Sequence, residues 1–218
     1  MTVTSRTAAD LLRAARLIPV LTIERAEHAV PLARALVAGG VCVLEVTLRT
    51  EAGEAAARAI AAEVPEATVG LGTVLTARDL ALAHTLKLAF AFSPGATPEL
   101  LNAASTLGVT FIPGIASASE LMAAMARGFK TVKLFPAEAV GGIGTLRALA
   151  GPFPEARFCP TGGISEDKVT DYLALSNVVA VGGSWLVTAA DLERQDWPAI
   201  TARARRIMER IGTSQNAT

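Results

Sequence analysis

The sequence has few charges, few aromatic residues and no excess of charge of either sign. Of its 218 residues, 18% are charged and 5% are aromatic, whereas 51% are hydrophobic. Basic and acidic side chains number 20 each, so the formal net charge is zero. This balance offers no electrostatic attraction to nucleic acid or to an anionic membrane, and the high aliphatic content excludes a disordered chain. We therefore expect a folded protein whose partner is a small molecule.

Long hydrophobic runs are also absent. The longest stretch without a charge, residues 100–119, contains Asn102, Pro113 and several glycine, serine and threonine residues. A membrane-spanning helix needs about 20 predominantly apolar residues, so this stretch predicts a helix, a turn and a strand instead. The first ten residues contain no basic segment followed by an apolar block, and no signal peptide is expected. We expect no membrane association and a cytoplasmic location.

Cysteine and histidine are equally scarce. Cys42 and Cys159 each lie in an apolar, strand-like run, which predicts two buried free thiols in a reducing compartment. Their spacing supports neither a disulfide nor a catalytic thiol. His28 and His84 lie on helical stretches far apart in the sequence, where we expect both to be solvated. No cluster of histidines and carboxylates typical of a metal site accompanies them, so no metal cofactor is expected.

Short apolar runs alternate with helical stretches along almost the whole chain. Strands are predicted at residues 18–23, 41–48, 68–74, 88–93, 110–113, 131–135, 157–161 and 178–181. Helices are predicted at 25–38, 52–63, 76–87, 97–107, 117–127, 144–150, 166–174 and 196–211, after an amphipathic N-terminal helix at 7–17. Continuous apolar strands separated by helices indicate a parallel sheet, and eight such units in about 200 residues fit a single (β/α)8 TIM barrel. We expect one α/β domain over residues 1–218, with a frayed tail at 212–218.

An open doubly wound sheet is the competing fold. That fold would be expected to carry a glycine-rich phosphate loop after its first strand. Here the first strand is followed by Thr22-Ile23-Glu24-Arg25, which contains no glycine. The glycine-rich turns come late in the chain, which favours the barrel.

Alternation along two predicted strands places charged side chains inside the barrel. In the second strand Cys42, Leu44, Val46 and Leu48 would face the helices, and Val43, Glu45, Thr47 and Arg49 would face inward. In the sixth strand Val132 and Leu134 would face the helices, and Thr131, Lys133 and Phe135 would face inward. Burying a carboxylate and an ammonium costs several kcal/mol unless they are paired or functional. The alternative to a functional role is a structural ion pair of Glu45 with Lys133 or Arg49.

A buried lysine at the end of a barrel strand has a well-defined chemical use. The chain has four lysines, and Lys133 is the one predicted to be buried. Desolvation or a neighbouring cation favours a neutral amine, which can attack a ketone and form a Schiff base. The protonated imine withdraws electrons, so that a nearby C–C bond can break or form. Glu45 is the inward carboxylate available to move the protons.

Glycine turns follow the last two predicted strands. They are Thr161-Gly162-Gly163-Ile164 and Gly182-Gly183-Ser184-Trp185. In many barrels these two loops form a phosphate pocket from backbone N–H groups and a hydroxyl. We interpret Gly162, Gly163 and Ser184 as such a pocket; the alternative is that the glycines only shape tight turns.

Taken together, these motifs resemble one known family. The segments EVTLRT at 45–50, GTVL at 72–75, SPG at 93–95, KLFPAE at 133–138, PTGGI at 160–164 and GGSWLV at 182–187 are similar to those of the 2-keto-3-deoxy-6-phosphogluconate (KDPG) and 4-hydroxy-2-oxoglutarate aldolases. The resemblance extends from about Ile18 to Val187. It implies a metal-free class I aldolase on a (β/α)8 barrel that forms a homotrimer. Its substrates would be KDPG, pyruvate and D-glyceraldehyde 3-phosphate of the Entner–Doudoroff pathway, often with 4-hydroxy-2-oxoglutarate.

The resemblance also implies a role for each matching residue. Lys133 would form the Schiff base and Glu45 would be the general acid and base. Arg49 would hold the substrate carboxylate beside Thr73, and Pro94 and Phe135 would line the pocket. Thr161 would contact the substrate, while Gly162, Gly163 and Ser184 would help to hold the phosphate. Two residues depart from the pattern: Leu71 and Val140 stand where smaller or more polar residues are expected. Leu71 would crowd the inner face beside Thr73 and alter substrate preference.

Two other functions are compatible with a barrel that has these residues. One is a sugar-phosphate isomerase or epimerase in which Glu45 acts as a base without a covalent step. The other is a protein that only binds a phosphorylated metabolite, with Glu45 and Lys133 as a structural ion pair. A covalent adduct of pyruvate on Lys133 would distinguish the aldolase from both.

Overall fold

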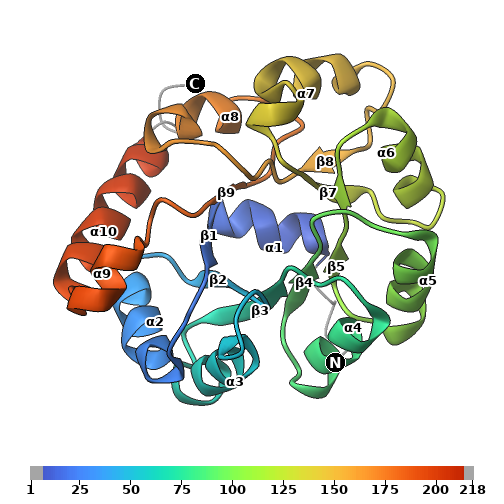
Figure 1. The fold of residues 1–218 in the computed structure, drawn as a ribbon. Helices are drawn as coiled ribbons and strands as arrows, with labels where there is room; N and C mark the ends of the chain where they lie inside the picture. The colour runs from blue at the N-terminus through green and yellow to red at the C-terminus, as the bar shows by residue number, and fades with distance from the viewer. Residues whose placement is uncertain (1–6, 214–218) are drawn as a thin grey trace, which may run out of the picture.

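The computed structural model describes residues 7–213, in which strands lie at the centre, the first helix crosses the middle and the other helices surround the strands (Figure 1). The strands are β1 (Leu17–Leu21), β2 (Val43–Thr47), β3 (Thr68–Gly72), β4 (Phe90–Phe92), β5 (Phe111–Ile112), β6 (Gly114–Ile115), β7 (Thr131–Leu134), β8 (Arg157–Phe158) and β9 (Val181–Gly183). The helices are α1 (Ala8–Ala15), α2 (Ala29–Ala38), α3 (Gly53–Glu63), α4 (Ala77–Thr85), α5 (Pro98–Leu107), α6 (Ala118–Met125), α7 (Gly142–Ala150), α8 (Val169–Leu173), α9 (Ala189–Arg194) and α10 (Trp197–Thr213). Short 3-10 turns are η1 (Ala26–His28), η2 (Glu138–Val140) and η3 (Glu166–Lys168).

The prediction of a closed eight-stranded TIM barrel is wrong. The strands form two parallel sheets, one of six strands in the order β5-β4-β3-β2-β1-β9 and one of three strands in the order β6-β7-β8. A proline lies at each seam. Pro113 separates β5, which pairs with β4, from β6, which pairs with β7, and Pro160 lies between β8 and an isolated bridge from Thr161 to Gly182. Because proline has no N–H to donate, the ladder is interrupted at both places.

Local signals position several helices where they were predicted. Thr76 and Thr97 cap α4 and α5 through their side-chain oxygens, which accept hydrogen bonds from Asp79 N and Leu100 N, as N-cap residues do. Gly108 ends α5 in the left-handed conformation, with φ of 66°, which glycine adopts without steric cost. These caps fix where each helix begins and ends beside its strand.

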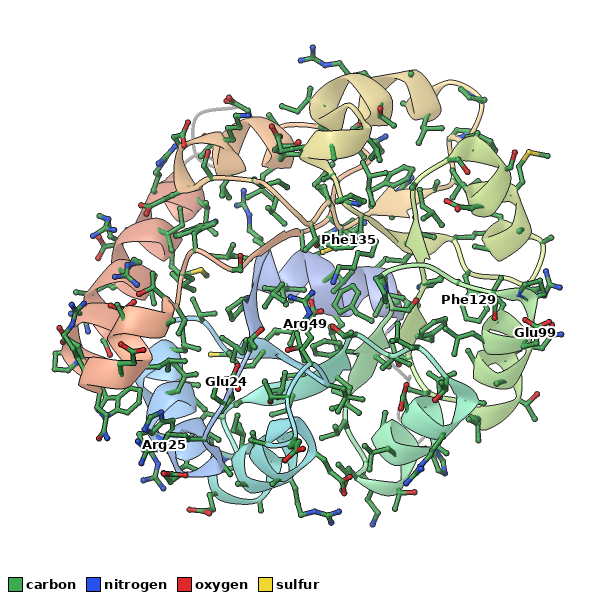
Figure 2. The ribbon with its side chains drawn as sticks, in the orientation of Figure 1. Glu24, Arg25, Arg49, Glu99, Phe129 and Phe135 are labelled. Atoms are coloured by element: carbon green, nitrogen blue, oxygen red, sulfur yellow. The ribbon has the colours of Figure 1, made fainter. Side chains whose placement is uncertain are left out.

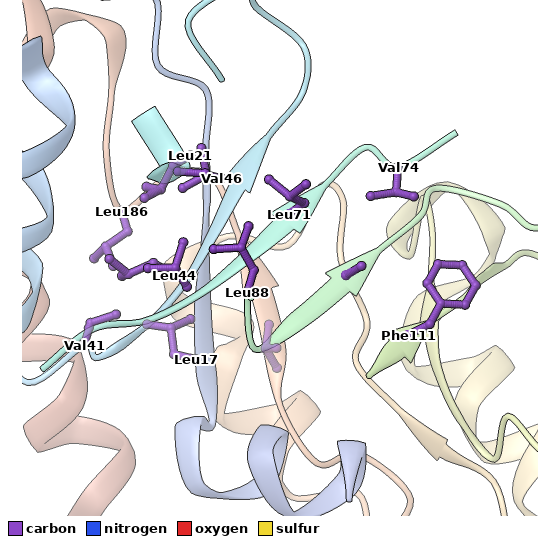
Figure 3. Packing of buried hydrophobic residues seen from close by; sticks show 14 of the residues in the cluster. Leu17, Leu21, Val41, Leu44, Val46, Leu71, Val74, Leu88, Phe111 and Leu186 are labelled. Atoms are coloured by element: carbon purple, nitrogen blue, oxygen red, sulfur yellow. The ribbon is translucent and has the colours of Figure 1, made fainter. Parts of the chain in front are cut away.

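Two apolar clusters lie on opposite faces of the strands. The larger one fills the space between strands and helices and includes Leu44, Val46 and Leu71 (Figure 3). The smaller one fills the interior between the sheets. Its buried members are Leu12, Ile18, Phe90, Phe92, Ile112, Cys159, Val179 and Ala180. Because Leu12 belongs to α1 and most of the others lie at or near the beginnings of strands, α1 seals the interior at the N-terminal end of the strands.

Several local predictions are corrected by the structure. Cys159 is buried as expected, but Cys42 is exposed because it precedes β2 instead of lying within it. His84 is exposed as expected. His28, in contrast, is only 6% exposed and packs edge-on against Trp197 of α10, with ring centroids 5.8 Å apart. The helix α9 was not predicted.

The C-terminal prediction is also only partly tested. Gly212 and Thr213 are the last residues of α10 and not part of a frayed tail, and residues 214–218 lie outside the described part of the chain. Within residues 7–213, none of the helices combines the length and the apolar character that crossing a bilayer requires.

Candidate active site

A buried ion pair lies in the interior and is made by Lys133 of β7 and Glu45 of β2. The Lys133 Nζ donates to Glu45 Oε1 at 2.9 Å and to Oε2 at 3.3 Å. The side chains are 3% and 1% exposed. Alternation along β2 and β7 therefore placed both side chains correctly, since Leu44, Val46, Val132 and Leu134 all belong to the cluster that faces the helices.

The neighbouring strand leaves room for the Glu45 carboxylate because it has no side chain at the facing position. A Cβ atom on Gly72 of β3 would lie 2.2 Å from Glu45 Oε1, far inside van der Waals contact. In the same strand, Leu71 points to the helix side. The expectation that Leu71 crowds the inner face is therefore wrong, and Val140 packs against the outer cluster as well.

Two aromatic rings flank the Lys133 ammonium. Its Nζ lies 4.9 Å from the centroid of Phe92 and 5.6 Å from that of Phe135. Such rings attract a cation through their negative faces and exclude water around the nitrogen. Phe135 was predicted to line the site. Phe92 was missed, although alternation along residues 90–92 indicates that its side chain shares a face with Phe90.

Arg49 and Thr73 meet beyond the ends of β2 and β3. The Arg49 Nε donates to the Thr73 hydroxyl at 3.0 Å. Thr73 adopts a φ of 58°, a conformation that is costly for a β-branched residue and that is concentrated at functional sites. Arg49 is exposed and extends over the middle of the molecule near Phe135 (Figure 2), so that most of its guanidinium remains available to a planar anion.

A cavity of about 210 Å³ joins most of the predicted binding residues. It is lined by Val20, Arg49, Phe135, Thr161, Gly162, Gly163, Ile164, Gly182, Gly183 and Ser184. Gly162 and Gly163 have φ of 103° and 79°, so both need glycine. Lys133 and Glu45 do not line this cavity, but the Lys133 Nζ lies 5.6 Å from the ring centroid of Phe135, a residue that does. Pro94 follows β4 and does not line it either.

A larger cavity of about 530 Å³ lies beside the first and shares Val20 and Ser184 with it. Its other lining residues include Thr22, Glu24, Arg25 and His28 from the segment after β1. The sequence contains no motif that indicates this cavity, because its walls come from two distant parts of the chain, residues 20–32 and residues 184–193.

Two other observations limit the chemistry at the site. Burial raises the pKa of the Cys159 thiol to about 12, which leaves a neutral, poorly nucleophilic sulfur. Among the residues that the structure describes, no three histidine, cysteine or acidic side chains gather as a metal ion requires. The buried amine of Lys133 can serve as a nucleophile in this geometry, and Glu45 lies within hydrogen-bond distance to accept its proton.

Comparison with known proteins identifies the family of this chain. The KDPG and KHG aldolase family matches residues 8–203. The chain is 54% identical to the KHG/KDPG aldolase of Escherichia coli strain K12 over 202 residues, which are 93% of this chain and 95% of the relative.

Two crystal structures provide ligand-bound relatives. The KDPG aldolase of Legionella pneumophila, with pyruvate captured as a covalent carbinolamine, superposes with a TM-score of 0.90 at 42% identity, covering 93% of this chain and 98% of that one. The KDPG aldolase of Zymomonas mobilis ZM4 with 3-phosphoglycerate superposes with a TM-score of 0.87 at 42% identity, covering 92% of this chain and 94% of that one. The family match, the sequence identity and the superposition lead to one conclusion: this chain belongs to the KDPG and KHG aldolase family.

Proposed function

We propose that this protein is a class I aldolase that reversibly cleaves KDPG to pyruvate and D-glyceraldehyde 3-phosphate and that also acts on 4-hydroxy-2-oxoglutarate. The observation that carries the proposal is the ion pair of Lys133 with Glu45, buried beside a cavity lined by Arg49 and by the two glycine turns. The Legionella relative with a covalent pyruvate carbinolamine supports a Schiff-base mechanism for the family.

The reaction begins with the transfer of a proton from the Lys133 ammonium to Glu45, 2.9 Å away. The free amine attacks the C2 ketone, and Glu45 returns a proton so that the carbinolamine can lose water to give a protonated imine. Glu45 then removes the proton of the C4 hydroxyl. The C3–C4 bond breaks, its electrons enter the imine to give an enamine, and the aldehyde leaves. Protonation at C3 and hydrolysis of the imine release pyruvate and regenerate Lys133.

The remaining residues would hold the two ends of the substrate. Arg49 and Thr73 bind the carboxylate next to the imine, and Pro94, Phe135 and Thr161 contact the carbon chain. Gly162, Gly163 and Ser184 bind the phosphate through N–H groups and the serine hydroxyl, a recurring use of turns at the ends of parallel strands. The Zymomonas relative with 3-phosphoglycerate supports a site for a phosphorylated three-carbon compound in this family.

The direct test is to incubate the purified protein with KDPG and to measure pyruvate release, with and without a metal chelator. The account predicts stoichiometric pyruvate and glyceraldehyde 3-phosphate at a rate that the chelator does not change. Conversion of KDPG to an isomer without pyruvate, or no conversion, would contradict it. Loss of activity with the chelator would contradict the metal-free mechanism alone.

We extend the proposal to a single domain over residues 1–218, a homotrimer and a cytoplasmic location, which the family resemblance and the sequence composition support. Light scattering during size-exclusion chromatography tests the homotrimer. A mass three times that of the chain is expected, and a monomer would contradict it.

A further inference from the structure

Glu138 of η2 has two side-chain partners that the proposed reaction does not use. Its Oε2 accepts a hydrogen bond from the Lys168 Nζ at 2.5 Å, and its Oε1 accepts one from the Tyr172 hydroxyl. Tyr172 of α8 is fully buried, whereas Lys168 of η3 is about half exposed. Glu138 does not line the cavity that contains Ser184, so it does not contact the expected substrate directly.

The backbone of Glu138 is joined to the first glycine turn. The Glu138 N donates to the Gly162 carbonyl at 3.1 Å, and the Ala137 N donates to the Thr161 carbonyl at 2.8 Å. The other side of the same turn lines the proposed phosphate site. The turn is therefore placed between Glu138 and the cavity.

Close packing makes this placement sensitive to the position of Glu138. A Cβ atom on Gly163 would lie 2.9 Å from Glu138 Cβ, and one on Gly142 would lie 2.5 Å from the Tyr172 hydroxyl oxygen. Neither glycine leaves space for a side chain, so the turn packs closely against Glu138, and Tyr172 packs closely against Gly142. The turn therefore rests on Glu138 at Gly163, and on Pro136 and Phe135 at Gly162, so a shift of Glu138 would move the Gly163 side of the turn.

Charge adds a second effect. Hydrogen bonds from Lys168 and Tyr172 lower the pKa of Glu138, so its carboxylate is anionic near neutral pH. An anion behind a phosphate site repels the ligand, and the Lys168 ammonium compensates that charge.

We propose that Glu138, held by Tyr172 and Lys168, is a positioning residue that fixes the Gly162–Gly163 turn for the substrate phosphate. This inference rests on the proposed function, since it concerns the phosphate of the same substrate. Lys133 and Glu45 do not line the cavity that contains the turn, and the hydrogen bonds of Glu138 go to Lys168 and Tyr172 and not to either of them. Loosening the turn therefore weakens binding of the phosphate and leaves the attack on the ketone unchanged.

The test compares KDPG with its unphosphorylated analogue, 2-keto-3-deoxygluconate, on wild type and on Tyr172→Phe. Removing the hydroxyl leaves a carboxylate oxygen without its partner. We expect KM for KDPG to rise about tenfold, as for the loss of one charged hydrogen bond. We expect a change of less than about twofold for the analogue and an unchanged rate of borohydride trapping with pyruvate.

Lys168→Met provides a second variant at a half-exposed position, where misfolding is not expected. It leaves the Glu138 charge uncompensated, and we expect KM for KDPG to rise about threefold without a change for the analogue. The matched control is Lys130→Met, which removes a surface lysine paired with Glu155 at 2.6 Å. We expect this substitution to leave KM unchanged for both substrates.

The outcomes separate the two levels of the account. If wild type does not cleave KDPG, the proposed function fails. If wild type cleaves KDPG but both variants keep its KM, or change KM equally for the two substrates, the positioning role of Glu138 is overturned. An equal loss of activity toward both substrates would mean that the hydrogen bonds of Glu138 only stabilise the fold.

Discussion

The two ends of the interior between the strands differ in polarity. At the N-terminal end, α1 and the inner cluster are mostly apolar, and burial keeps the Cys159 thiol of that cluster neutral. Toward the C-terminal end the same interior contains Glu45 and Lys133, and beyond them lie Arg49 and the glycine turns. Parallel strands place all their carboxyl ends on one side, which is why polar side chains and loops collect there.

The difference shows how the fold bears the cost of a buried charge. Desolvating two ions costs several kcal/mol per ion, and their mutual attraction offsets that cost only when the geometry is good. Burial of side chains at the apolar end raises the free energy of unfolding, and desolvation of Glu45 and Lys133 at the catalytic end lowers it. Substitutions at the two ends should therefore separate activity from stability.

The largest effect is expected for Lys133→Met, which removes the nucleophile. KDPG cleavage should fall on the order of 10⁴-fold or more, and pyruvate with borohydride should give no adduct. Steady-state kinetics and intact mass measure both. The matched control, Lys130→Met, should retain both activities; a Lys133→Met enzyme with more than a few per cent of wild-type activity would refute the covalent route.

Glu45→Gln should reduce kcat by about 10²–10⁴-fold, the usual contribution of a general acid and base. The variant keeps Lys133, so a slow covalent adduct with pyruvate should still accumulate in the presence of borohydride. Activity close to wild type would show that Glu45 only pairs with Lys133 and that another group moves the protons.

Leu12→Ala tests the apolar end. Leu12 of α1 is fully buried within the inner cluster, and its truncation should lower the free energy of unfolding by about 2–5 kcal/mol. The partly buried neighbour Leu11 is the control, because Leu11→Ala should cost less. Denaturant unfolding measures both; kcat per folded molecule should stay near wild type, and a large drop in kcat would mean that the two ends are coupled.

The smallest effect concerns a carboxylate at the catalytic end that serves stability only. Asp191 of α9 accepts hydrogen bonds from the Arg203 Nη1 at 2.7 Å and from the Thr188 hydroxyl at 2.7 Å, and these bonds lower its pKa. A lowered folded-state pKa adds stability above the unfolded-state value of about 3.9, and this stability is lost as the pH falls through the folded-state pKa.

Asp191→Asn should therefore be less stable than wild type by about 2 kcal/mol at pH 7, with the difference narrowing at pH 3. Urea unfolding at the two pH values measures it. If the difference in the free energy of unfolding is the same at both pH values, the effect comes from packing and not from charge. Aldolase kinetics should be unchanged in this variant.

Much of the catalytic end could be predicted from the sequence because it depends on local patterns. Alternation along β2 and β7 places Glu45 and Lys133 inside, and the two glycine pairs mark the turns that line the cavity. These inferences need only the direction of side chains on a strand.

The remaining features depend on partners far apart in the sequence. The ladder is interrupted at Pro113 and Pro160, and which neighbour each short strand pairs with is decided by long-range packing. His28 is buried because it meets Trp197 of α10. Periodicity alone contains no information about such contacts, which explains why the closed barrel and the solvated histidine were wrong.

The central claim is that the amine of Lys133 captures the keto acid covalently. Wild-type protein is treated with pyruvate and borohydride, digested, and its peptides are mapped by mass spectrometry. The account predicts one reduced pyruvyl group on Lys133 and none on Lys87, Lys130 or Lys168. A modification on another lysine, or unmodified protein that still cleaves KDPG, would contradict it.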